Sequence, residues 1–324
     1  MDKGDVIAQA QEAIAKAKAD AKKPFSTCLS PQDTYNEMVG KGAKNVESHW
    51  TKVVHAGFYG GLYVGYGGFL SIVVAGGFSD DFQTENPGPL GFIFGILFPV
   101  NLLLLLLTGG QLFTGNAATM PCAWCEGKAT ILDVLKVWGI SWVSNQCGAL
   151  LFAFAVTYCG LNSGKTAKMA IKTLKKKLSA DWGKTFVKGI LCNWMVCMAV
   201  WFSCQAQDLT GKMVGIYIPI SSFVAMGFEH APANMFMLPL GLLAQQQEFD
   251  DDTYEANYNA WDIYWKNLIP AGLGNAVAGT VIVAMGYSLI YGKFNKFMPH
   301  LEPKLPTVAK LPTAPPVEAA EEKA

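Results

Sequence analysis

The stretch Gly227-Phe228-Glu229-His230-Ala231-Pro232-Ala233-Asn234 sets an acid beside an imidazole within an apolar run that extends from 214 to 244. A charged side chain at bilayer depth costs roughly 2.5 to 3.5 kcal/mol on insertion scales, so ionisable groups inside a membrane are functional by default. If this run crosses a membrane, we expect His230 to lie on a transport path.

The overall composition is that of a membrane protein. Of the 324 residues, 51% are hydrophobic and 15% are charged, whereas about a quarter of the residues in a soluble domain are charged. The charges fall in patches that separate apolar runs near the roughly 20 residues needed to span a bilayer. Six runs are counted, at about 54–77, 90–120, 131–159, 186–205, 214–244 and 263–291. We therefore expect an all-α, multi-pass integral membrane protein.

The span count and the lysine distribution predict the orientation. An even number of spans places both termini on one side, and with that side internal 16 lysines lie inside and nine outside, as the positive-inside rule requires. The predicted domains are an internal N-terminal segment at 1–52, beginning with a short solvated helix, a six-span domain at 53–292, and a disordered Pro-rich internal tail at 293–324. The plasma membrane and an organelle envelope fit equally well.

The second and fifth runs are both interrupted in the middle. Three glycines interrupt the second at 109–116, and Pro232, which removes a helix donor, interrupts the fifth. Irregular backbone at membrane depth is tolerated only where it is buried in protein or lines a cavity, and matching breaks in two halves indicate inverted repeats with the site between them. Ser144-Asn145 in the third run and Gly274-Asn275 in the sixth support two inverted three-helix repeats.

Other features narrow the classes of site and partner. All 25 basic residues are lysines, so an anion site must use point charges, amides, imidazole or helix ends in place of an arginine fork. The zero net charge argues against a nucleic-acid partner. Cys122 and Cys125 form a single CxxC without a second pair, so we expect no metal and no cofactor. Gly57, Gly61 and Gly65 predict close helix packing, either within the chain or between subunits.

Four motifs, in this order, resemble the formate/nitrite transporters. They are Leu112-Phe113-Thr114-Gly115-Asn116, Gly189-Ile190-Leu191-Cys192-Asn193-Trp194, Gly227 to Phe236, and Asn267-Leu268-Ile269-Pro270 leading to Gly274-Asn275. The resemblance covers about 24–291 and implies an aquaporin-like homopentamer with one pore in each subunit. The long Lys-rich loop and the Pro-rich tail favour a eukaryotic, algal-type member.

The resemblance also implies roles for single residues. His230 matches the central pore histidine, Thr114 the hydroxyl that faces it, and Lys177 the lysine of the outer vestibule. Asn193 and Asn275 match amides near the pore, with Glu229, Asn116 and Asn234 in support. The two hydrophobic constrictions would be formed by Phe98, Leu102, Leu112, Phe113 and Phe223.

Three positions depart from the family pattern. Ser144 stands where a glycine is common, and Pro232 follows the histidine unusually closely, so both alter the local backbone and packing. Gln111 replaces an acidic residue, which puts a charge role at that position in doubt.

The predicted chemistry is the passage of a small monovalent weak acid. Loss of hydration in apolar constrictions is costly for an anion, so it must be neutralised. Lysines between Lys165 and Lys188 would concentrate anions outside, and His230, with an ordinary pKa near 6.5, would share a proton near neutral pH. Thr114 would donate a hydrogen bond and gate by moving its loop. We expect Glu229 to point away from the pore and to accept from loop amides or an asparagine such as Asn116.

Several alternatives share these residues. A passive channel and a proton-coupled transporter are not distinguished, and bicarbonate or lactate can replace formate or nitrite as the anion. A water or glycerol channel would need two Asn-Pro-Ala turns, which the sequence lacks. An intramembrane enzyme would use His230 as its base, but neither His-Glu-x-x-His nor Gly-x-Ser-x-Gly occurs. The favoured reading is a transporter or channel and not an enzyme.

Overall fold

The fold was analysed in a computed structural model that describes residues 26–246 and 257–297. The expected N-terminal solvated helix and most of the Pro-rich tail lie outside these residues. The described residues fold into helices and connecting loops. The helices of the first half are α2 (Pro31–Glu47), α3 (Trp50–Gly77), α4 (Asp80–Glu85), α5 (Pro87–Leu97), α6 (Val100–Thr108), α7 (Phe113–Cys125) and α8 (Ile131–Tyr158). Those of the second half are α9 (Gly164–Leu178), α10 (Trp182–Gln205), α11 (Leu209–Ala225), α12 (Ala231–Ala244), and a last span of α13 (Ala260–Ile263), η2 (Tyr264–Leu268), α14 (Ile269–Val277), η3 (Ala278–Met285) and α15 (Gly286–Tyr291), after which η4 (Lys293–Phe297) forms a short turn.

The predicted apolar runs correspond to helices of membrane-spanning length. Five helical stretches in the described part of the chain are long and apolar enough to cross a bilayer, and α11 and α12 are shorter apolar helices on either side of a break. Together α11 and α12 occupy the predicted fifth run. The all-α, multi-pass prediction is therefore confirmed.

Both predicted breaks occur, and glycines make them. Helix α6 ends at Thr108 and is followed by Gly109 with φ of 82°, while α11 ends at Ala225 and is followed two residues later by Gly227 with φ of 72°. Side chains rarely adopt this left-handed conformation, which glycine takes freely. Pro232 was expected to cause the second break but lies in the first turn of α12, where proline is well tolerated. It therefore helps to start a helix and does not interrupt one.

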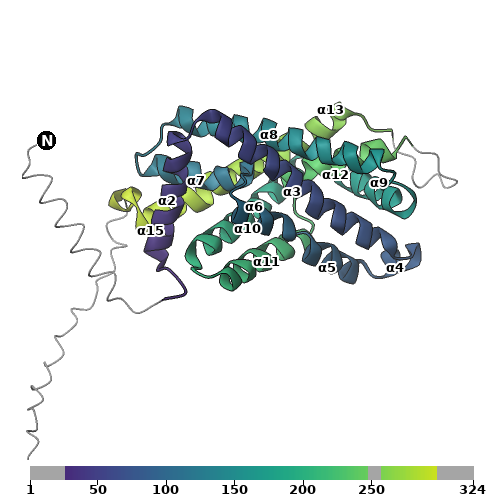
Figure 1. The fold of residues 1–324 in the computed structure, drawn as a ribbon, viewed down its shortest axis with the longest axis horizontal. Helices are drawn as coiled ribbons and strands as arrows, with labels where there is room; N and C mark the ends of the chain where they lie inside the picture. Colours follow the sequence, from purple (N-terminus) through teal and green to yellow (C-terminus); the bar gives the residue numbers. More distant parts are fainter. Residues whose placement is uncertain (1–25, 247–256, 298–324) are drawn as a thin grey trace, which may run out of the picture.

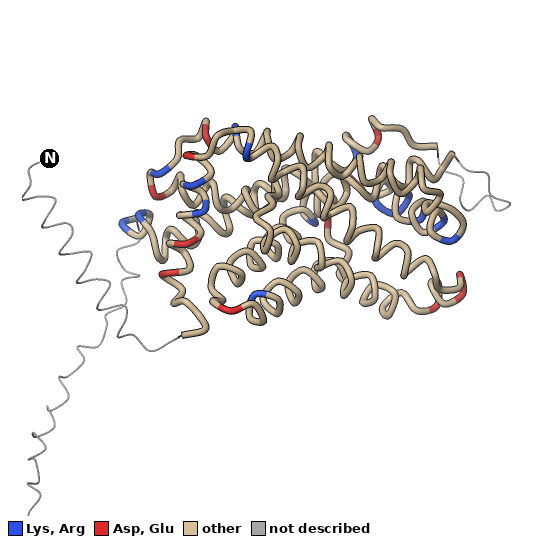
Figure 2. The backbone as a smooth tube through the Cα atoms, viewed as in Figure 1, with Lys and Arg blue, Asp and Glu red and all other residues tan. Residues whose placement is uncertain are grey.

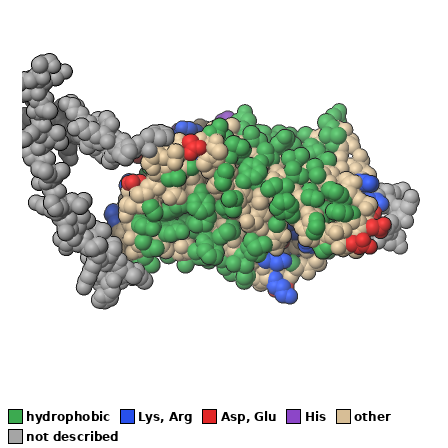
Figure 3. Space-filling model, turned by 90° about the horizontal axis from the view of Figure 1, so that it is seen from below, with side chains coloured by type: hydrophobic (Ala, Val, Ile, Leu, Met, Phe, Trp, Pro, Cys, Tyr) green, Lys and Arg blue, Asp and Glu red, His purple; other side chains and the backbone are tan. Residues whose placement is uncertain are grey.

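Charge and apolar surface are distributed as a bilayer demands. Helices α2 and α15 lie at one end of the molecule and α4 and α9 at the other, with α3 and α8 running between them (Figure 1). The charged residues gather mainly toward these ends (Figure 2), and a broad band of hydrophobic side chains covers the face between them (Figure 3). Gln32 Nε2 donates to Tyr291 O at 2.9 Å, so α2 and the end of α15 lie on the same side of the molecule, as an even number of spans predicts.

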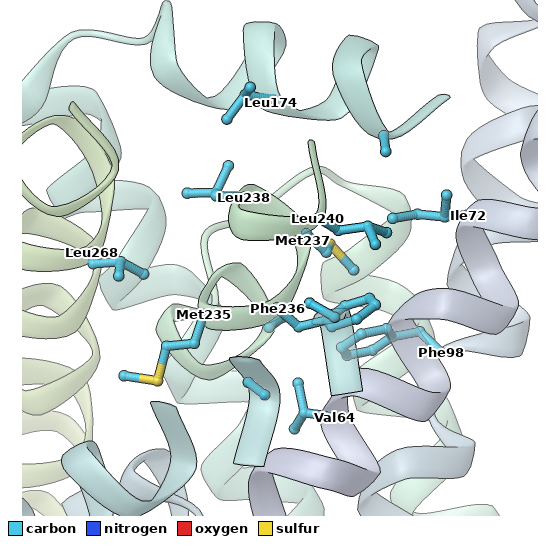
Figure 4. Close-up of a cluster of buried hydrophobic side chains, with 14 of the residues drawn as sticks. Val64, Ile72, Phe98, Leu174, Met235, Phe236, Met237, Leu238, Leu240 and Leu268 are labelled. Carbon is cyan, nitrogen blue, oxygen red and sulfur yellow. The ribbon is translucent and has the colours of Figure 1, made fainter. Parts of the chain in front are cut away.

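The half-helices α7 and α12 form the centre of the fold. Nearly every residue of α12 is buried, and its side chains pack against α3, α9 and the last span in one hydrophobic cluster (Figure 4). A helix that is apolar on all sides belongs in the interior of a large protein or a membrane bundle. The longer spans therefore enclose α7 and α12.

Helix α3 packs against α8 through glycines. A Cβ atom built on Gly61 would lie 2.1 Å from Asn145 O, and one on Gly65 would lie 2.8 Å from Phe152 Cβ. A Cβ on Gly57 would meet Ser144 Oγ at 2.0 Å. Of the two readings of these glycines, the structure shows packing within the chain. It also explains Ser144, whose hydroxyl occupies the space that Gly57 leaves open.

The two halves repeat the same packing. Helix α2 packs on α7 as α9 packs on α12, and α3 packs on α8 as α10 packs on α14. Each half-helix also contacts the third span of the other half, because α7 packs on η3 and α12 on α8. The chain is thus two inverted three-span repeats with a broken second span in each.

Candidate functional site

A histidine and a threonine from the two broken helices meet in the interior. Thr114 Oγ1 lies 2.9 Å from His230 Nε2, and both side chains are buried. His230 Nδ1 is buried without a hydrogen-bond partner among the described residues. Whichever partner donates in the Thr114–His230 bond, the other ring nitrogen is left for a proton donor or acceptor. Thr114 was expected on a loop but lies in the first turn of α7, so it is held by a helix.

The N-termini of the two half-helices converge at this pair. Helix α7 begins at Phe113, one residue before Thr114, and α12 begins at Ala231, one residue after His230. A helix N-terminus carries about half a positive elementary charge and free N–H groups, and two such ends facing a buried site favour an anion. Sequence reasoning named helix ends as one option, and the fold supplies two of them.

An asparagine from α8 braces the first break. Asn145 Oδ1 accepts from Phe113 N at 2.8 Å, so it caps α7, which has no side-chain cap of its own. Asn145 Nδ2 donates to Gly57 O at 2.8 Å and to Gln111 O at 2.9 Å. One side chain thereby ties the first N–H of α7 and the turn before it to α3.

Asn275 braces the second break in the same way. Its Oδ1 accepts from Ala231 N at 3.0 Å, and its Nδ2 donates to Gly189 O at 2.8 Å and to Glu229 O at 3.0 Å. Asn275 thus binds backbone on both sides of His230 and holds it without contacting the ring through any of these bonds.

Asn193 links the two halves. Its Nδ2 donates to Asn275 O at 2.6 Å and to Thr114 O at 3.3 Å. Its Oδ1 is buried and has no partner among the residues described. Asn193 therefore ties the Thr114 backbone to the Asn275 brace near the central pair.

A cavity of about 420 Å³ leads to His230 from the α9 end of the molecule. Phe98, Phe223 and His230 line it together with residues of α5, α9, α11 and α12. Its four lysines are Lys172, Lys176, Lys177 and Lys188. Helix α9 presents the first three of these charges because its apolar residues, including Ile171 and Leu174, are buried on the opposite side, and Lys188 comes from α10. The Lys-rich segment is thus an amphipathic helix that also faces a cavity.

Glu229 is the anionic partner of Lys177 in this cavity. Lys177 Nζ lies 2.9 Å from Glu229 Oε2, and the side chains are 16% and 4% exposed. Asn234 Nδ2 and Asn267 Nδ2 donate to the same oxygen at 2.7 and 3.2 Å. Glu229 was expected to point away from the pore, whereas the structure places it in the lining of this cavity with Lys177. An asparagine does bind it, but this is Asn234 and not Asn116.

Asn116 belongs to a separate cluster in the first half. Its Nδ2 donates to Gln111 Oε1 at 3.1 Å and to Ser141 Oγ at 2.7 Å. Its Oδ1 accepts from Asn45 Nδ2 at 3.1 Å. Gln111, which replaces an acidic residue of the family pattern, therefore works as an amide within a neutral network.

The residues predicted for the constrictions fall into two groups. The rings of Phe98 and Phe223 lie edge to face with centroids 6.5 Å apart, and the Phe223 centroid is 5.6 Å from that of His230. Leu102 and Leu112 are buried in the same hydrophobic cluster as this pair. Phe113 instead packs its ring against Trp138 and Trp142 of α8.

Sequence reasoning missed two polar residues of this region as site residues. Asn267 accepts from Asn234 Nδ2 at 2.6 Å in addition to its bond to Glu229. Asn45 accepts from Gln111 Nε2 at 2.8 Å. Asn267 had a signal, since it begins one of the four family motifs. Asn45 lies in a polar helix before the first span and had none.

Comparisons with known proteins agree with this architecture. Residues 32–289 match the sequence profile described as "Formate/nitrite transporter". The chain is 33% identical over 285 residues to a "Probable formate transporter" of Methanothermobacter thermautotrophicus, covering 83% of this chain and 99% of that protein. It is 30% identical over 265 residues to the "Formate channel BtFdhC" of Bacillus thuringiensis, covering 81% and 96%. A solved structure titled "Pentameric formate channel with formate bound" superposes with a TM-score of 0.65 at 28% identity, over 75% of this chain and 97% of that one.

Proposed function

Because this chain belongs to the formate/nitrite transporter family, we propose that it moves a small monovalent weak acid such as formate or nitrite across a membrane. The relatives named for formate support this substrate class. The observation that carries the proposal is the buried Thr114–His230 pair, at which the N-termini of α7 and α12 converge.

The lysine-lined cavity suits the capture of an anion. Four lysines and one carboxylate give its lining a positive balance, and a cleft of one sign with low-dielectric walls raises the local concentration of the opposite ion. Lys177 forms an ion pair with Glu229, which also lines the cavity. An anion that enters from the α9 end meets these charges before it reaches the aromatic residues.

Beyond the lysines the path becomes apolar, so we propose that the acid crosses in its protonated form. Phe98 and Phe223 narrow the path beside His230, and Leu102, Leu112 and Phe113 surround its continuation. An ion loses its hydration there at a cost of several kcal/mol or more, whereas a neutral acid does not carry this penalty. His230 shares the proton through its free ring nitrogen, and Thr114 donates or accepts at the other one. The backbone and side chains of the two breaks are held by five polar residues, namely Asn193, Asn275, Glu229, Asn116 and Asn234.

We also propose that the protein assembles as a homopentamer. The solved relative with formate bound is titled pentameric, and large apolar side chains are exposed along the spans of this chain, including Phe92 and Val143. Lipid and neighbouring subunits both suit such a surface. His230 is assigned to transport and not to catalysis, in keeping with the transporters and channels among the relatives.

The test is uptake into proteoliposomes at pH 5.5 and 7.5. Formate, nitrite, lactate and bicarbonate are compared in the wild type and in His230→Phe. We expect rapid formate or nitrite uptake that is faster at pH 5.5, and loss of this pH dependence in His230→Phe. His55→Phe is the matched control, because His55 is exposed on α3 and bonds Thr51 O.

Two results would contradict the proposal. Absence of flux of all four acids by the folded wild type would exclude weak-acid transport. An unchanged pH profile in His230→Phe would leave the transport assignment intact but would remove the proton-sharing role from the imidazole.

A further inference from the structure

Each broken helix carries a polar side-chain cluster, and the two clusters occupy equivalent places in the repeat. Asn45 lies twelve residues before Gly57 and Lys177 twelve residues before Gly189, and these are the two glycines whose carbonyls accept from the bracing asparagines. The backbone contacts match as well, because Gln111 N donates to Ala56 O at 3.0 Å and Glu229 N donates to Lys188 O at 3.4 Å. The repeat therefore relates Asn45 to Lys177 and Gln111 to Glu229.

The side chains of the two clusters form similar hydrogen-bond patterns. In the second half, Lys177 and Asn234 both donate to Glu229 at 2.9 and 2.7 Å. In the first half, Gln111 Nε2 donates to Asn45 Oδ1 at 2.8 Å and Asn116 Nδ2 donates to Gln111 Oε1 at 3.1 Å. Asn45 Nδ2 closes the ring by donating to Asn116 Oδ1 at 3.1 Å. Three amides thus bond one another where the second half has an ammonium, a carboxylate and an amide. Asn45 Nδ2 and Gln111 Nε2 each make one of these bonds, so each keeps a second N–H that can be donated to a ligand.

The clusters differ in charge. Lys177 and Glu229 correspond to Asn45 and Gln111, and the cavity-lining Lys188 corresponds to Ala56. One charge is shared by the two halves, because the exposed Lys44 is equivalent to Lys176. The neutral cluster is joined to α2, and α2 lies at the end of the molecule opposite α9 (Figure 1). The side chains of Asn45 and Gln111 are half-buried there.

We propose that Asn45, Gln111 and Asn116 form the second mouth of the translocation path, a binding site for the same small weak acid that is built from amides without an ion pair. The inference rests on the proposed function. Amide N–H and C=O groups can hold a carboxylic or oxo acid by paired hydrogen bonds, but they do not concentrate its anion as the lysines of the other mouth do. The two faces of the protein therefore bind the substrate with unequal affinity.

This asymmetry has a definite kinetic form. At equal pH on both sides and zero voltage, a passive path has an equilibrium constant of one, so the ratio Vmax/KM is the same from either face. A lower KM at the α9 face is then accompanied by a lower Vmax from that face. We expect the two KM values to differ by about ten-fold, the low end of the concentration effect of a charged cleft.

The experiment measures initial formate flux over a range of concentrations in sealed vesicles of both orientations, with equal pH inside and outside. An impermeant thiol reagent reports the orientation of a Cys28→Ser variant through Cys159, which is exposed just after α8 at the α9 end. The test variant is Asn45→Lys with Gln111→Glu, which installs in the first half the ion pair of the second. It is expected to reduce the difference between the two KM values to less than about threefold. Asn36→Lys, which makes the same asparagine-to-lysine change at an exposed position of α2 outside the cluster, is the control and keeps the wild-type difference.

The outcomes separate the two proposals. Absence of flux from either face overturns the proposed function and this inference with it. Flux with equal KM values from both faces of the wild type keeps the function but overturns the asymmetry. If the double variant does not fold, Lys177→Asn with Glu229→Gln makes the second half neutral like the first. It should raise the KM at the α9 face alone, and an unchanged KM there overturns the inference.

Discussion

Removal of either bracing asparagine should destabilise the fold by a similar amount. Asn145 and Asn275 lie on different spans, but each accepts from the first N–H of a half-helix and donates to one loop carbonyl and to one carbonyl of a neighbouring helix. Both side chains are fully buried. In Asn145→Ala or Asn275→Ala, three hydrogen bonds to backbone groups in the interior are lost at once.

The magnitude follows from the number of bonds. A hydrogen bond contributes about 1 kcal/mol net, and a buried group left without its partner costs about 1 to 3 kcal/mol. Three lost bonds therefore amount to at least about 3 kcal/mol for each variant. Since about 1 kcal/mol shifts the Tm of a domain of 150 to 250 residues by roughly 2 to 4 °C, we expect a decrease of about 6 to 12 °C.

Asn275→Asp tests the direction of the bonds. It keeps the shape of the side chain but turns an oxygen toward Gly189 O and Glu229 O, which now face an acceptor instead of a donor. We expect a larger decrease in Tm than for Asn275→Ala at neutral pH, because a buried carboxylate oxygen then faces two carbonyl oxygens with no hydrogen between them.

The assay is thermal unfolding in detergent, followed by a dye that becomes fluorescent on reacting with thiols. The chain suits this assay because Cys122, Cys125, Cys192, Cys197 and Cys204 are buried in the folded state. Asn36→Ala, at an exposed position of α2, is the control. If Asn145→Ala and Asn275→Ala both melted within about 1 °C of the control, the bracing role would be refuted.

Two further predictions concern packing and pH. Gly274→Ala should prevent folding, because its Cβ would lie 2.2 Å from Phe186 O. In contrast, the Cβ of Gly139→Ala meets nothing within 4 Å, so this variant should raise stability by up to about 1 kcal/mol. The yield of monodisperse protein and the Tm test both expectations. Tyr35 in α2 donates to Glu126 Oε1 at 2.9 Å, and burial raises the pKa of its hydroxyl well above the ordinary value. The unfolded chain ionises Tyr35 near pH 10, so the stability it contributes is complete below that pH and is lost above it. The Tm of the wild type should therefore fall relative to Tyr35→Phe between pH 9 and 11, and parallel Tm curves would contradict this.

The breaks and the duplicated spans were predictable because they depend on local chemistry. A left-handed turn needs a glycine, as at Gly109 and Gly227, and an apolar span needs a run of about 20 residues. A polar residue in such a run, such as Asn145 or Asn275, must find a partner in the interior. These requirements leave direct traces in the sequence, and the structure confirms the fold they predicted.

The partners of the polar residues were not predictable in the same way. Asn267 and Asn275 are eight residues apart, a spacing that puts two side chains on one face only approximately in a regular α-helix. The wider turns of η2 and η3 change the rotation along this span. Asn267 thereby reaches Glu229, where the sequence suggested Asn116. Which carboxylate meets which amide depends on such rotations and on contacts between spans, and periodicity does not encode them.

The duplication separates what the backbone requires from what the substrate requires. Each break leaves the first N–H of a half-helix and a loop carbonyl to be bonded in an apolar interior, so both halves need an asparagine at the same place, and Asn145 and Asn275 make the same three bonds. No such constraint acts on the side chain that approaches each break from the preceding amphipathic helix. An amide at position 45 and an ammonium at position 177 both satisfy their neighbours. Hydrogen bonding alone therefore does not decide between the amide ring and the ion pair. The proposed difference in anion binding at the two mouths supplies a physical reason why the two halves carry different clusters.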